Sequence, residues 1–264
     1  MDADRAKGGD GILVSLKSTL SIVVGASEGI GAAIAGGLAR AGSRLVLGGR
    51  DKGRMAATLA GIRDQGGAAD FESVDARSPE AIPSFADAVL RKHGTPTILV
   101  NSMGGTLIKE MRQVEADEWD ELHNTHLRGT FLICRAFADA MARNGYGKII
   151  NLSSLAAFRG NRLRGVYSVA KAGLNHLTAV LASEWGPSGI RVNAIAPATT
   201  RTPRALKQFG KEPEREAGIV ARTPLGRMAT PEDMVGPALF LASPLSDFVS
   251  GQVLVVDGGS MTVR

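Results

Sequence analysis

The sequence predicts a three-layer α/β/α sandwich built on a parallel, doubly wound sheet of about seven strands. Short apolar runs alternate with segments of helical period along almost the whole chain. The runs are continuous rather than alternating, as expected of strands that are covered on both faces. They lie at residues 20–24, 45–47, 98–100, 149–152, 192–195 and 253–256. Strand–helix–strand repetition implies parallel pairing through right-handed crossovers.

No linker or repeat divides the chain, so we expect one domain over residues 15–264, preceded by a disordered extension at residues 1–14. The first helix begins near Gly31 and stops at Ala41-Gly42, and a later helix carries Tyr167 and stops at Gly186-Pro187.

Residues 203–222 are rich in charge and follow a strand. Insertions at this place are either lids over a substrate or solvated surface helices.

Composition argues against several classes of protein. Lys plus Arg is 31 and Asp plus Glu is 26, which gives a net charge of +5, but the basic residues are scattered and aromatic residues are few, so we expect no nucleic-acid partner. The single cysteine, Cys134, permits no internal disulfide and cannot hold a metal alone. No apolar run is long enough to cross a bilayer, and residues 1–11 lack a targeting pattern. We therefore expect a cytoplasmic protein with no metal and no membrane partner.

A glycine-rich turn, Gly25-Ala-Ser-Glu-Gly-Ile-Gly31, follows the first strand and opens the first helix. Glycines let the backbone turn sharply and approach a pyrophosphate, which the free N–H groups of a helix N-terminus bind. The same residues also read Gly-x-Ser-x-Gly, the nucleophile elbow of a hydrolase, with Ser27 as the nucleophile. An elbow needs a downstream histidine, and none of the 4 histidines stands in an obvious loop after a late strand. A serine hydrolase is therefore a distant third interpretation.

Tyr167 and Lys171 are four positions apart, which places a phenol and an ammonium one above the other on a helix face. A tyrosine in water has a pKa near ~10, and a neighbouring positive charge lowers it toward the range of acid–base catalysis. Ser154 comes just after the apolar run 149–152, so its hydroxyl is expected at the carboxyl edge of the sheet, facing the tyrosine.

Together these motifs resemble the short-chain dehydrogenase/reductase family, over about residues 16–259, and in particular members such as 3-oxoacyl-carrier-protein reductases and gluconate 5-dehydrogenases. The matching segments are Gly-Ala-Ser-Glu-Gly-Ile-Gly (25–31), Val-Asp (74–75), Asn-Ser-Met-Gly (101–104), Asn-Leu-Ser-Ser (151–154), Tyr-Ser-Val-Ala-Lys (167–171), Asn-Ala-Ile-Ala-Pro (193–197) and Val-Asp-Gly-Gly (256–259). The resemblance implies a Rossmann-type fold and hydride transfer between a nicotinamide and a carbonyl or secondary alcohol, hence a carbonyl reductase or alcohol dehydrogenase.

The resemblance also implies roles for individual residues. Tyr167 would be the general acid–base, Lys171 would lower its pKa and hold the nicotinamide ribose, and Ser154 would orient the carbonyl. His126 stands where the family has an asparagine that holds a water of a proton relay. The histidine either supports such a relay or only packs in its helix. The implied cofactor site comprises Gly25, Ser27, Glu28, Gly29, Ile30, Gly31, Gly49, Arg50, Asp75, Ala76, Asn101, Ser102, Tyr167, Lys171, Pro197, Thr200 and Thr202.

Other departures from the family pattern are smaller. Val24 and Ser102 stand where threonine and asparagine are usual, so a hydrogen bond that braces the turn is expected to be missing, and Ala198 replaces a glycine. NADP(H) is favoured over NAD(H), because Gly49 replaces the acid that binds the ribose 2′-hydroxyl and Arg50 beside it suits a 2′-phosphate. Glu28 argues the other way, since a carboxylate repels that phosphate.

The substrate expected from the resemblance is a small carbonyl or alcohol compound: a ketone, a 3-oxoacyl group or a sugar acid. Arg159, Arg162 and Arg164 precede Tyr167 and either bind an acidic substrate or belong to a solvated loop. The family further implies a homotetramer built partly on the helices near 115–143 and 167–185. A non-catalytic, cofactor-binding regulatory protein on the same fold is the alternative function.

Overall fold

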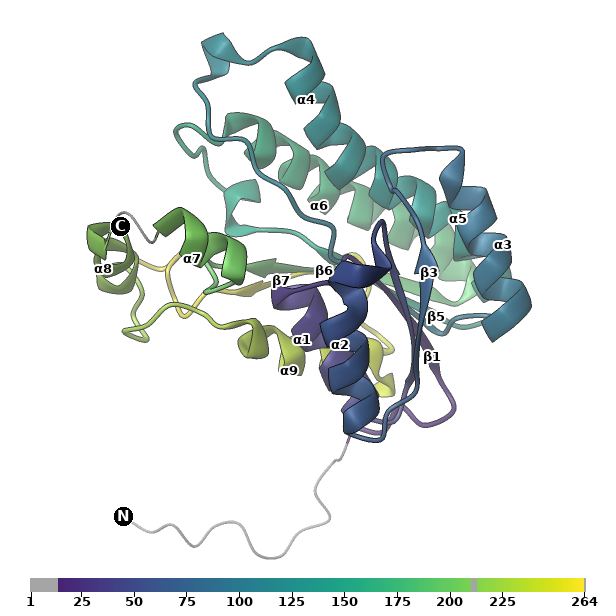
Figure 1. The fold of residues 1–264 in the computed structure, drawn as a ribbon. Coiled ribbons are helices and arrows are strands. Elements are labelled where there is room, and N and C mark those ends of the chain that lie inside the picture. The colour runs from purple at the N-terminus through teal and green to yellow at the C-terminus, as the bar shows by residue number, and fades with distance from the viewer. Residues whose placement is uncertain (1–13, 210–212, 264) are drawn as a thin grey trace, which may run out of the picture.

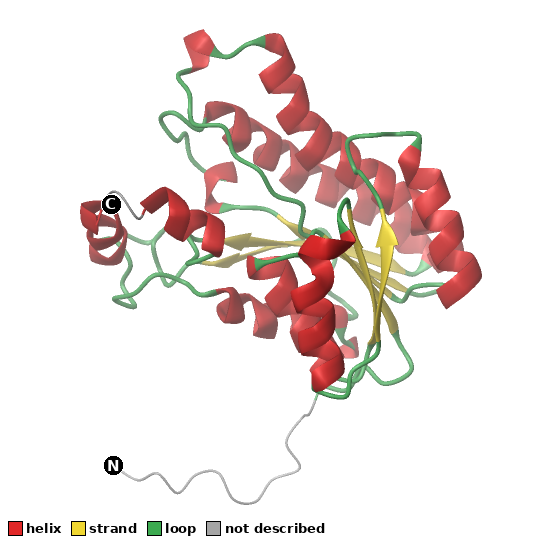
Figure 2. Ribbon diagram, in the orientation of Figure 1, coloured by secondary structure: helices red, strands yellow, loops and turns green. Residues whose placement is uncertain are grey.

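The computed structural model describes residues 14–209 and 213–263, and the expectation of a disordered extension at 1–14 lies outside the described residues except for Val14. Seven strands form one parallel sheet in the order β3-β2-β1-β4-β5-β6-β7 (Figures 1 and 2), which confirms the predicted fold class. The strands are β1 (Leu20–Val24), β2 (Arg44–Gly49), β3 (Ala69–Ser73), β4 (Ile98–Asn101), β5 (Gly147–Leu152), β6 (Ile190–Pro197) and β7 (Val253–Val256).

Helices cover both faces of this sheet, as Figure 1 shows. One layer consists of α1 (Gly29–Arg40), α2 (Lys52–Asp64) and α9 (Val235–Ala242), and the other consists of α3 (Ala81–His93), α5 (Gly129–Arg143) and α6 (Gly165–Trp185). The short α4 (Ala116–His123) packs against α6. Helices α7 (Pro203–Phe209) and α8 (Pro213–Ala221) follow β6 and contact each other. Among the helices of the described residues, none is long and apolar enough to span a membrane.

The two layers bury two separate apolar clusters, one on each face of the sheet. Successive strand residues point to opposite faces, so Val23 belongs to the cluster under α1, α2 and α9, and Ile22 belongs to the cluster under α3, α5 and α6. Both side chains are completely buried. This two-sided burial explains why the central strands read as continuous apolar runs. The edge strand β3 alternates and is half-exposed, which is why it is absent from those runs.

The strand order reverses between β1 and β4. From β1 the chain runs outward through β2 and β3, and it then crosses back to pair β4 against the other side of β1. At such a switch point the loops after the two strands diverge and leave a crevice outside their carboxyl ends. The loops that follow β1 and β4 are those that begin at Gly25 and Ser102.

The turn after β1 packs too closely for any side chain. Gly25 has a φ of +88°, and a β-carbon on it would lie 2.6 Å from the carbonyl oxygen of Ser102. A β-carbon on Gly31, in the first turn of α1, would overlap the carbonyl oxygen of Gly25. The two glycines thus hold the start of α1 directly over the crevice between β1 and β4.

We predict that Gly31→Ala lowers the free energy of unfolding by about 1–3 kcal/mol, the usual range for overpacking, because the added methyl displaces the Gly25 carbonyl. Gly36→Ala on the same helix is the matched control. There a β-carbon meets only the end of the Arg40 side chain, at 3.3 Å. This variant should be more stable than the wild type by about 0.5–1 kcal/mol, the difference in helix propensity between the two residues. Urea denaturation measures both, and equal effects of the two substitutions would refute the packing argument.

Candidate active site

Ser154, Tyr167 and Lys171 lie together at the carboxyl end of β5. Ser154 follows β5, and Tyr167 and Lys171 lie in the first two turns of α6. The Ser154 hydroxyl hydrogen-bonds to the phenol of Tyr167 and also accepts the Ala156 N–H, 3.1 Å away. The Lys171 ammonium donates to the carbonyl oxygen of Leu152, 2.5 Å away, and lies 5.8 Å from the centre of the Tyr167 ring. The structure thus brings the three side chains predicted as catalytic to one place.

Burial acts in opposite directions on the two ionisable groups of this trio. It lowers the pKa of Lys171 to about 7, because an ammonium loses its hydration there. It also raises the pKa of Tyr167, while the hydrogen bond from Ser154 and the charges of Arg164 and Arg204 oppose that shift. The pKa of Lys171 therefore lies near neutrality, while the pKa of Tyr167 stays above its ordinary value.

His126 lies behind the tyrosine and is almost completely buried, at 1% exposure. Its ring meets the Tyr167 ring edge-on, with centroids 5.3 Å apart. Its Nε2 is 2.9 Å from the carbonyl oxygen of Gly105, so Nε2 carries the proton, and the buried Nδ1 has no partner among the described residues. Burial, followed by the charge of Lys171, lowers the pKa of His126 well below its ordinary value, which keeps the ring neutral.

The residues around His126 form a π-helical turn, Asn124–Arg128, between α4 and α5. Such turns, inserted into α-helices, frequently occur at functional sites. Neither this turn nor Gly105 as the partner of the histidine was predicted from the sequence. The inserted turn has no composition of its own, so the sequence offers no signal for it.

The crevice between β1 and β4 has the features of a site for a dinucleotide. Helix α1 has no side-chain cap at Glu28 and no acidic residue in its first turn, so its first N–H groups are available for a phosphate. Asn101 ends β4 in a buried position, and its Oδ1 atom has no partner among the described residues. The bare backbone at Gly25 lies against Ser102, which begins the loop after β4. These observations fit NAD(P).

The other predicted cofactor residues lie at the same edge of the sheet. Thr202 contacts Gly29, where a β-carbon would be 3.0 Å from its methyl group. Thr200 is buried and donates to the carbonyl oxygen of Ala198, 2.9 Å away. Pro197 ends β6, Ser27 and Ile30 lie in or just after the turn that follows β1, and Ala76 follows β3.

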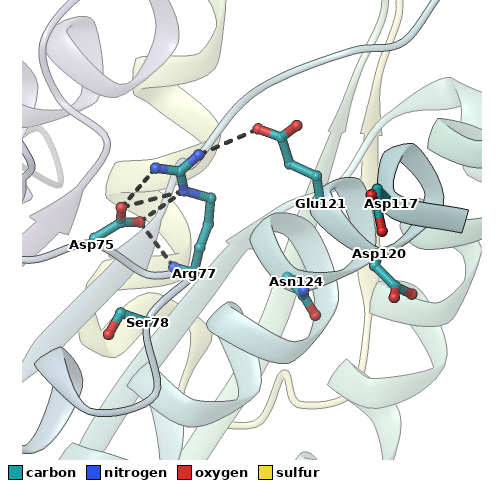
Figure 3. Close-up of a pocket in the computed structure, with 7 residues that line it drawn as sticks. All are labelled: Asp75, Arg77, Ser78, Asp117, Asp120, Glu121 and Asn124. Carbon is teal, nitrogen blue, oxygen red and sulfur yellow. Dashed lines mark hydrogen bonds and ion pairs between the residues drawn. The ribbon is translucent and has the colours of Figure 1, made fainter.

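Gly49 and Arg50 lie at the end of β2, where Arg50 is exposed. Asp75 follows β3 and is held by Arg77 at 2.7 Å. The hydrogen bond from Arg77 keeps the pKa of Asp75 below its ordinary value. Arg77 also reaches Glu121 at 3.2 Å, across a hollow of about 380 Å³ that Figure 3 shows. Other acidic side chains, Asp117 and Asp120, line the far side of this hollow.

The hydrolase interpretation loses support from this geometry. Ser27 lines a groove between α1 and α2 whose described lining residues include no histidine, which argues against a hydrolase elbow. The groups of His, Cys, Asp and Glu in the described residues include none that could hold a metal ion. Cys134 is completely buried and has a thiol pKa raised to about 12 by burial, so it is not a nucleophile.

The chain is similar to known proteins over most of its length. A family model described as enoyl-(acyl carrier protein) reductase matches residues 25–261. The gluconate 5-dehydrogenase of Gluconobacter oxydans (strain 621H) is 34% identical over 247 residues, which cover 94% of this chain and 96% of the relative. The 2-dehydro-3-deoxy-D-gluconate 5-dehydrogenase of Escherichia coli (strain K12) is 33% identical over 246 residues, which cover 93% of this chain and 96% of the relative.

Among solved structures, a gluconate 5-dehydrogenase from Burkholderia cenocepacia J2315 in complex with NADP and tartrate superposes with a TM-score of 0.91 at 30% identity, covering 96% of this chain and 98% of that one. The family match and these relatives span nearly the whole chain, as does the fold they share. The chain therefore belongs to the short-chain dehydrogenase/reductase family of hydride-transferring oxidoreductases.

Proposed function

We propose that the protein is an NADP(H)-preferring dehydrogenase that interconverts a secondary hydroxyl and a ketone in a small sugar acid. The observation that carries the proposal is the meeting of Ser154, Tyr167 and Lys171 beside the crevice between β1 and β4. A proton donor next to a dinucleotide crevice is the arrangement that carbonyl reduction requires. A regulatory protein that only binds the cofactor has no need for such a trio.

When bound, the cofactor supplies or accepts a hydride at its nicotinamide. During reduction Tyr167 gives its proton to the substrate oxygen, and during oxidation it removes the proton from the hydroxyl. Ser154 holds the same oxygen through its hydroxyl and stabilises the charge that develops there. Lys171 favours the phenolate form of Tyr167 and holds the nicotinamide ribose. His126 packs edge-on against the tyrosine ring, and its Nδ1 can accept a hydrogen bond from a water of a proton relay.

The preference for NADP(H) rests on the charges at the end of β2. Arg77 already has two carboxylate partners, Asp75 and Glu121. Arg50 forms no ion pair with another described residue, so it is the cation available to a 2′-phosphate. Glu28 is exposed at the start of α1 and can turn into solvent. The relative from Burkholderia cenocepacia was crystallised with NADP, which supports the same choice.

The substrate class rests on the relatives and on cations near Tyr167. Two of the relatives are named for gluconate or a dehydro-deoxy-gluconate, both of which carry a carboxylate. Of the arginines that precede Tyr167, Arg162 is 87% exposed at its side chain and pairs with Glu110 at 3.6 Å, while Arg159 is exposed. Arg164 is half-buried and one helical turn from Tyr167, which leaves it as the candidate to meet an acidic substrate.

We further propose that residues 203–222 form a lid, since α7 and α8 directly follow the loop that carries Thr200 and Thr202. We also propose that residues 15–264 form one domain and that the protein is located in the cytoplasm. A homotetramer built partly on the helices near 115–143 and 167–185 is supported by α6. Its Val169 and Val180 are 47% and 38% exposed and lie eleven positions apart, on one helix face.

We predict that Tyr167→Phe lowers kcat about 100- to 10,000-fold, the contribution of a general acid–base, because the proton donor is lost. The dissociation constant of NADPH should change little, since the ring stays in place. Turnover of D-gluconate with NADP⁺ and fluorescence titration of NADPH give the two quantities.

Tyr146→Phe is the matched control for that experiment, because Tyr146 is the other of the 2 tyrosines. It donates to Asp247 at 2.8 Å and lies just before β5, at the end of that strand opposite to Ser154. Its kcat should equal that of the wild type. A Tyr167→Phe enzyme with normal kcat would refute the assigned mechanism.

We predict that Arg50→Ala weakens NADPH binding about tenfold or more, the usual worth of a hydrogen bond to a charged group, and leaves NADH binding unchanged. Arg91→Ala, an exposed arginine of α3, is the control and should affect neither cofactor. Equal weakening of NADPH and NADH in Arg50→Ala would mean that this arginine does not select the 2′-phosphate.

We predict that the protein sediments with the mass of four chains. Val169→Glu and Val180→Glu together should shift it to smaller species, because buried carboxylates without partners oppose association. Sedimentation velocity decides, and a monomer for the wild type at micromolar concentration would refute the tetramer.

A further inference from the structure

Arg164 lies on one side of Tyr167 without an anionic partner. It precedes α6 and caps the helix with a non-helical backbone, three residues before the tyrosine. It is half-buried, and its pKa is lowered, first by burial and then by the nearby charge of Arg215. Its side chain forms no ion pair or hydrogen bond with another described residue. A guanidinium that loses hydration without gaining a counter-ion is unfavourable until an anion binds it.

The backbone next to Arg164 is held in a strained form. Leu163 has a φ of +66°, a left-handed conformation that leucine rarely adopts. Its carbonyl oxygen accepts the Lys109 N–H, 2.8 Å away, and Met111 packs against Gly165. Contacts with the loop after β4 thus fix where Arg164 leaves the chain. Strain of this kind persists mainly at functional sites.

Arg204 approaches the same tyrosine from another element. It lies in the first turn of α7, and its Nη1 atom is 3.4 Å from the position that a β-carbon on Gly104 would take. The next residue, Gly105, accepts the hydrogen bond of His126, whose ring packs edge-on against Tyr167. Arg204 is exposed and forms no ion pair with another described residue. Its charge and that of Arg164 both act on the phenol of Tyr167.

Other cations in this part of the molecule already have partners. Lys109 pairs with Glu118 at 2.7 Å, and Arg201 pairs with Glu216 at 3.3 Å. Arg162 pairs with Glu110. Arg164 and Arg204 differ from these because they flank the proposed proton donor and have no carboxylate of the described chain beside them.

We propose that Arg164 and Arg204 together bind the carboxylate of the substrate and thereby determine the preference of this enzyme for hydroxy acids over neutral alcohols. This inference rests on the proposed function, since it places the carboxylate next to the hydroxyl that Tyr167 deprotonates. Guanidinium groups bind carboxylates through paired, charge-assisted hydrogen bonds. Because Arg204 belongs to α7, a bound carboxylate would also contact the candidate lid.

The alternative source of an anion at this place is a phosphate of the cofactor. The pyrophosphate site described above lies at the first turn of α1, where Thr202 contacts Gly29. Arg204 follows Thr202 by two residues, but its guanidinium lies at Gly104, on the loop after β4. Arg164 lies at the start of α6, three residues before Tyr167, and is not among the residues of the crevice between β1 and β4. The position of the pair therefore favours the substrate.

The test measures binding of tartrate, a small dicarboxylate, by calorimetry to protein saturated with NADPH, and then turnover of D-gluconate and of its neutral amide. Arg164→Gln and Arg204→Gln should each raise the tartrate Kd and the gluconate KM about tenfold or more, as expected for the loss of a charge-assisted hydrogen bond. The KM of the amide and the Kd of NADPH should stay at wild-type values. Arg162→Gln, which removes an exposed and already paired arginine from the same loop, should change none of these quantities.

Arg164→Lys and Arg204→Lys keep the charge and lose the planar fork, so they should fall between the wild type and the glutamine variants. The proposal is overturned if the amide and gluconate lose affinity equally, or if wild-type protein binds no tartrate. It is also overturned if Arg204→Gln weakens NADPH as much as tartrate, because the arginine then serves the cofactor. Failure of the proposed function has a different signature, namely undiminished turnover in Tyr167→Phe, which leaves the tartrate measurement intact.

Discussion

A series of buried amide and hydroxyl groups connects strands β4 and β5 to α6, the helix that carries the proposed proton donor. Asn101 at the end of β4 donates to Asn151 of β5 at 3.0 Å, and Asn151 donates to Thr178 of α6, also at 3.0 Å. All three side chains are at most 3% exposed, so an unmade bond among them would leave a buried polar group without a partner. These hydrogen bonds therefore specify the register between β4 and β5 and the rotation of α6 about its axis.

The rotation of α6 about its axis decides where the proposed catalytic groups point. Thr178 lies seven positions after Lys171 and eleven after Tyr167, so the three share a helix face. When Thr178 faces Asn151, the ammonium of Lys171 reaches the last carbonyl of β5, at Leu152, and Tyr167 meets Ser154. The trio is thus fixed by packing at a distance from the chemistry, which is how a rigid scaffold keeps a proton donor within hydrogen-bonding reach of a substrate.

The sequence predicted what depends on local pattern. Continuous apolar runs predicted the inner strands because those strands are buried on both faces. The glycine-rich turn could be predicted because it lies between an apolar run and a segment of helical period. Contacts that depend on how distant segments pack could not be predicted from the sequence. The Asn101–Asn151 bond joins residues fifty positions apart, and the strand at 69–73 alternates because it lies at an edge. Arg204 belonged to a charged segment in which nothing local distinguished it from its neighbours.

The placement of counter-ions decides which cations of this protein can serve a ligand. At the end of the crevice near β2 and β3, Arg77 has its charge satisfied by Asp75 and Glu121, so Arg50 is the cation that the proposed preference for NADP(H) requires. Near Tyr167 the described chain supplies no carboxylate to Arg164 or Arg204. Unpaired charges there also favour the phenolate of Tyr167, so the groups that attract an acidic ligand assist the proton transfer as well. A bound carboxylate would neutralise part of that effect. The same two guanidinium groups would therefore both hold the acid and favour the phenolate, so a bound acid weakens the second effect.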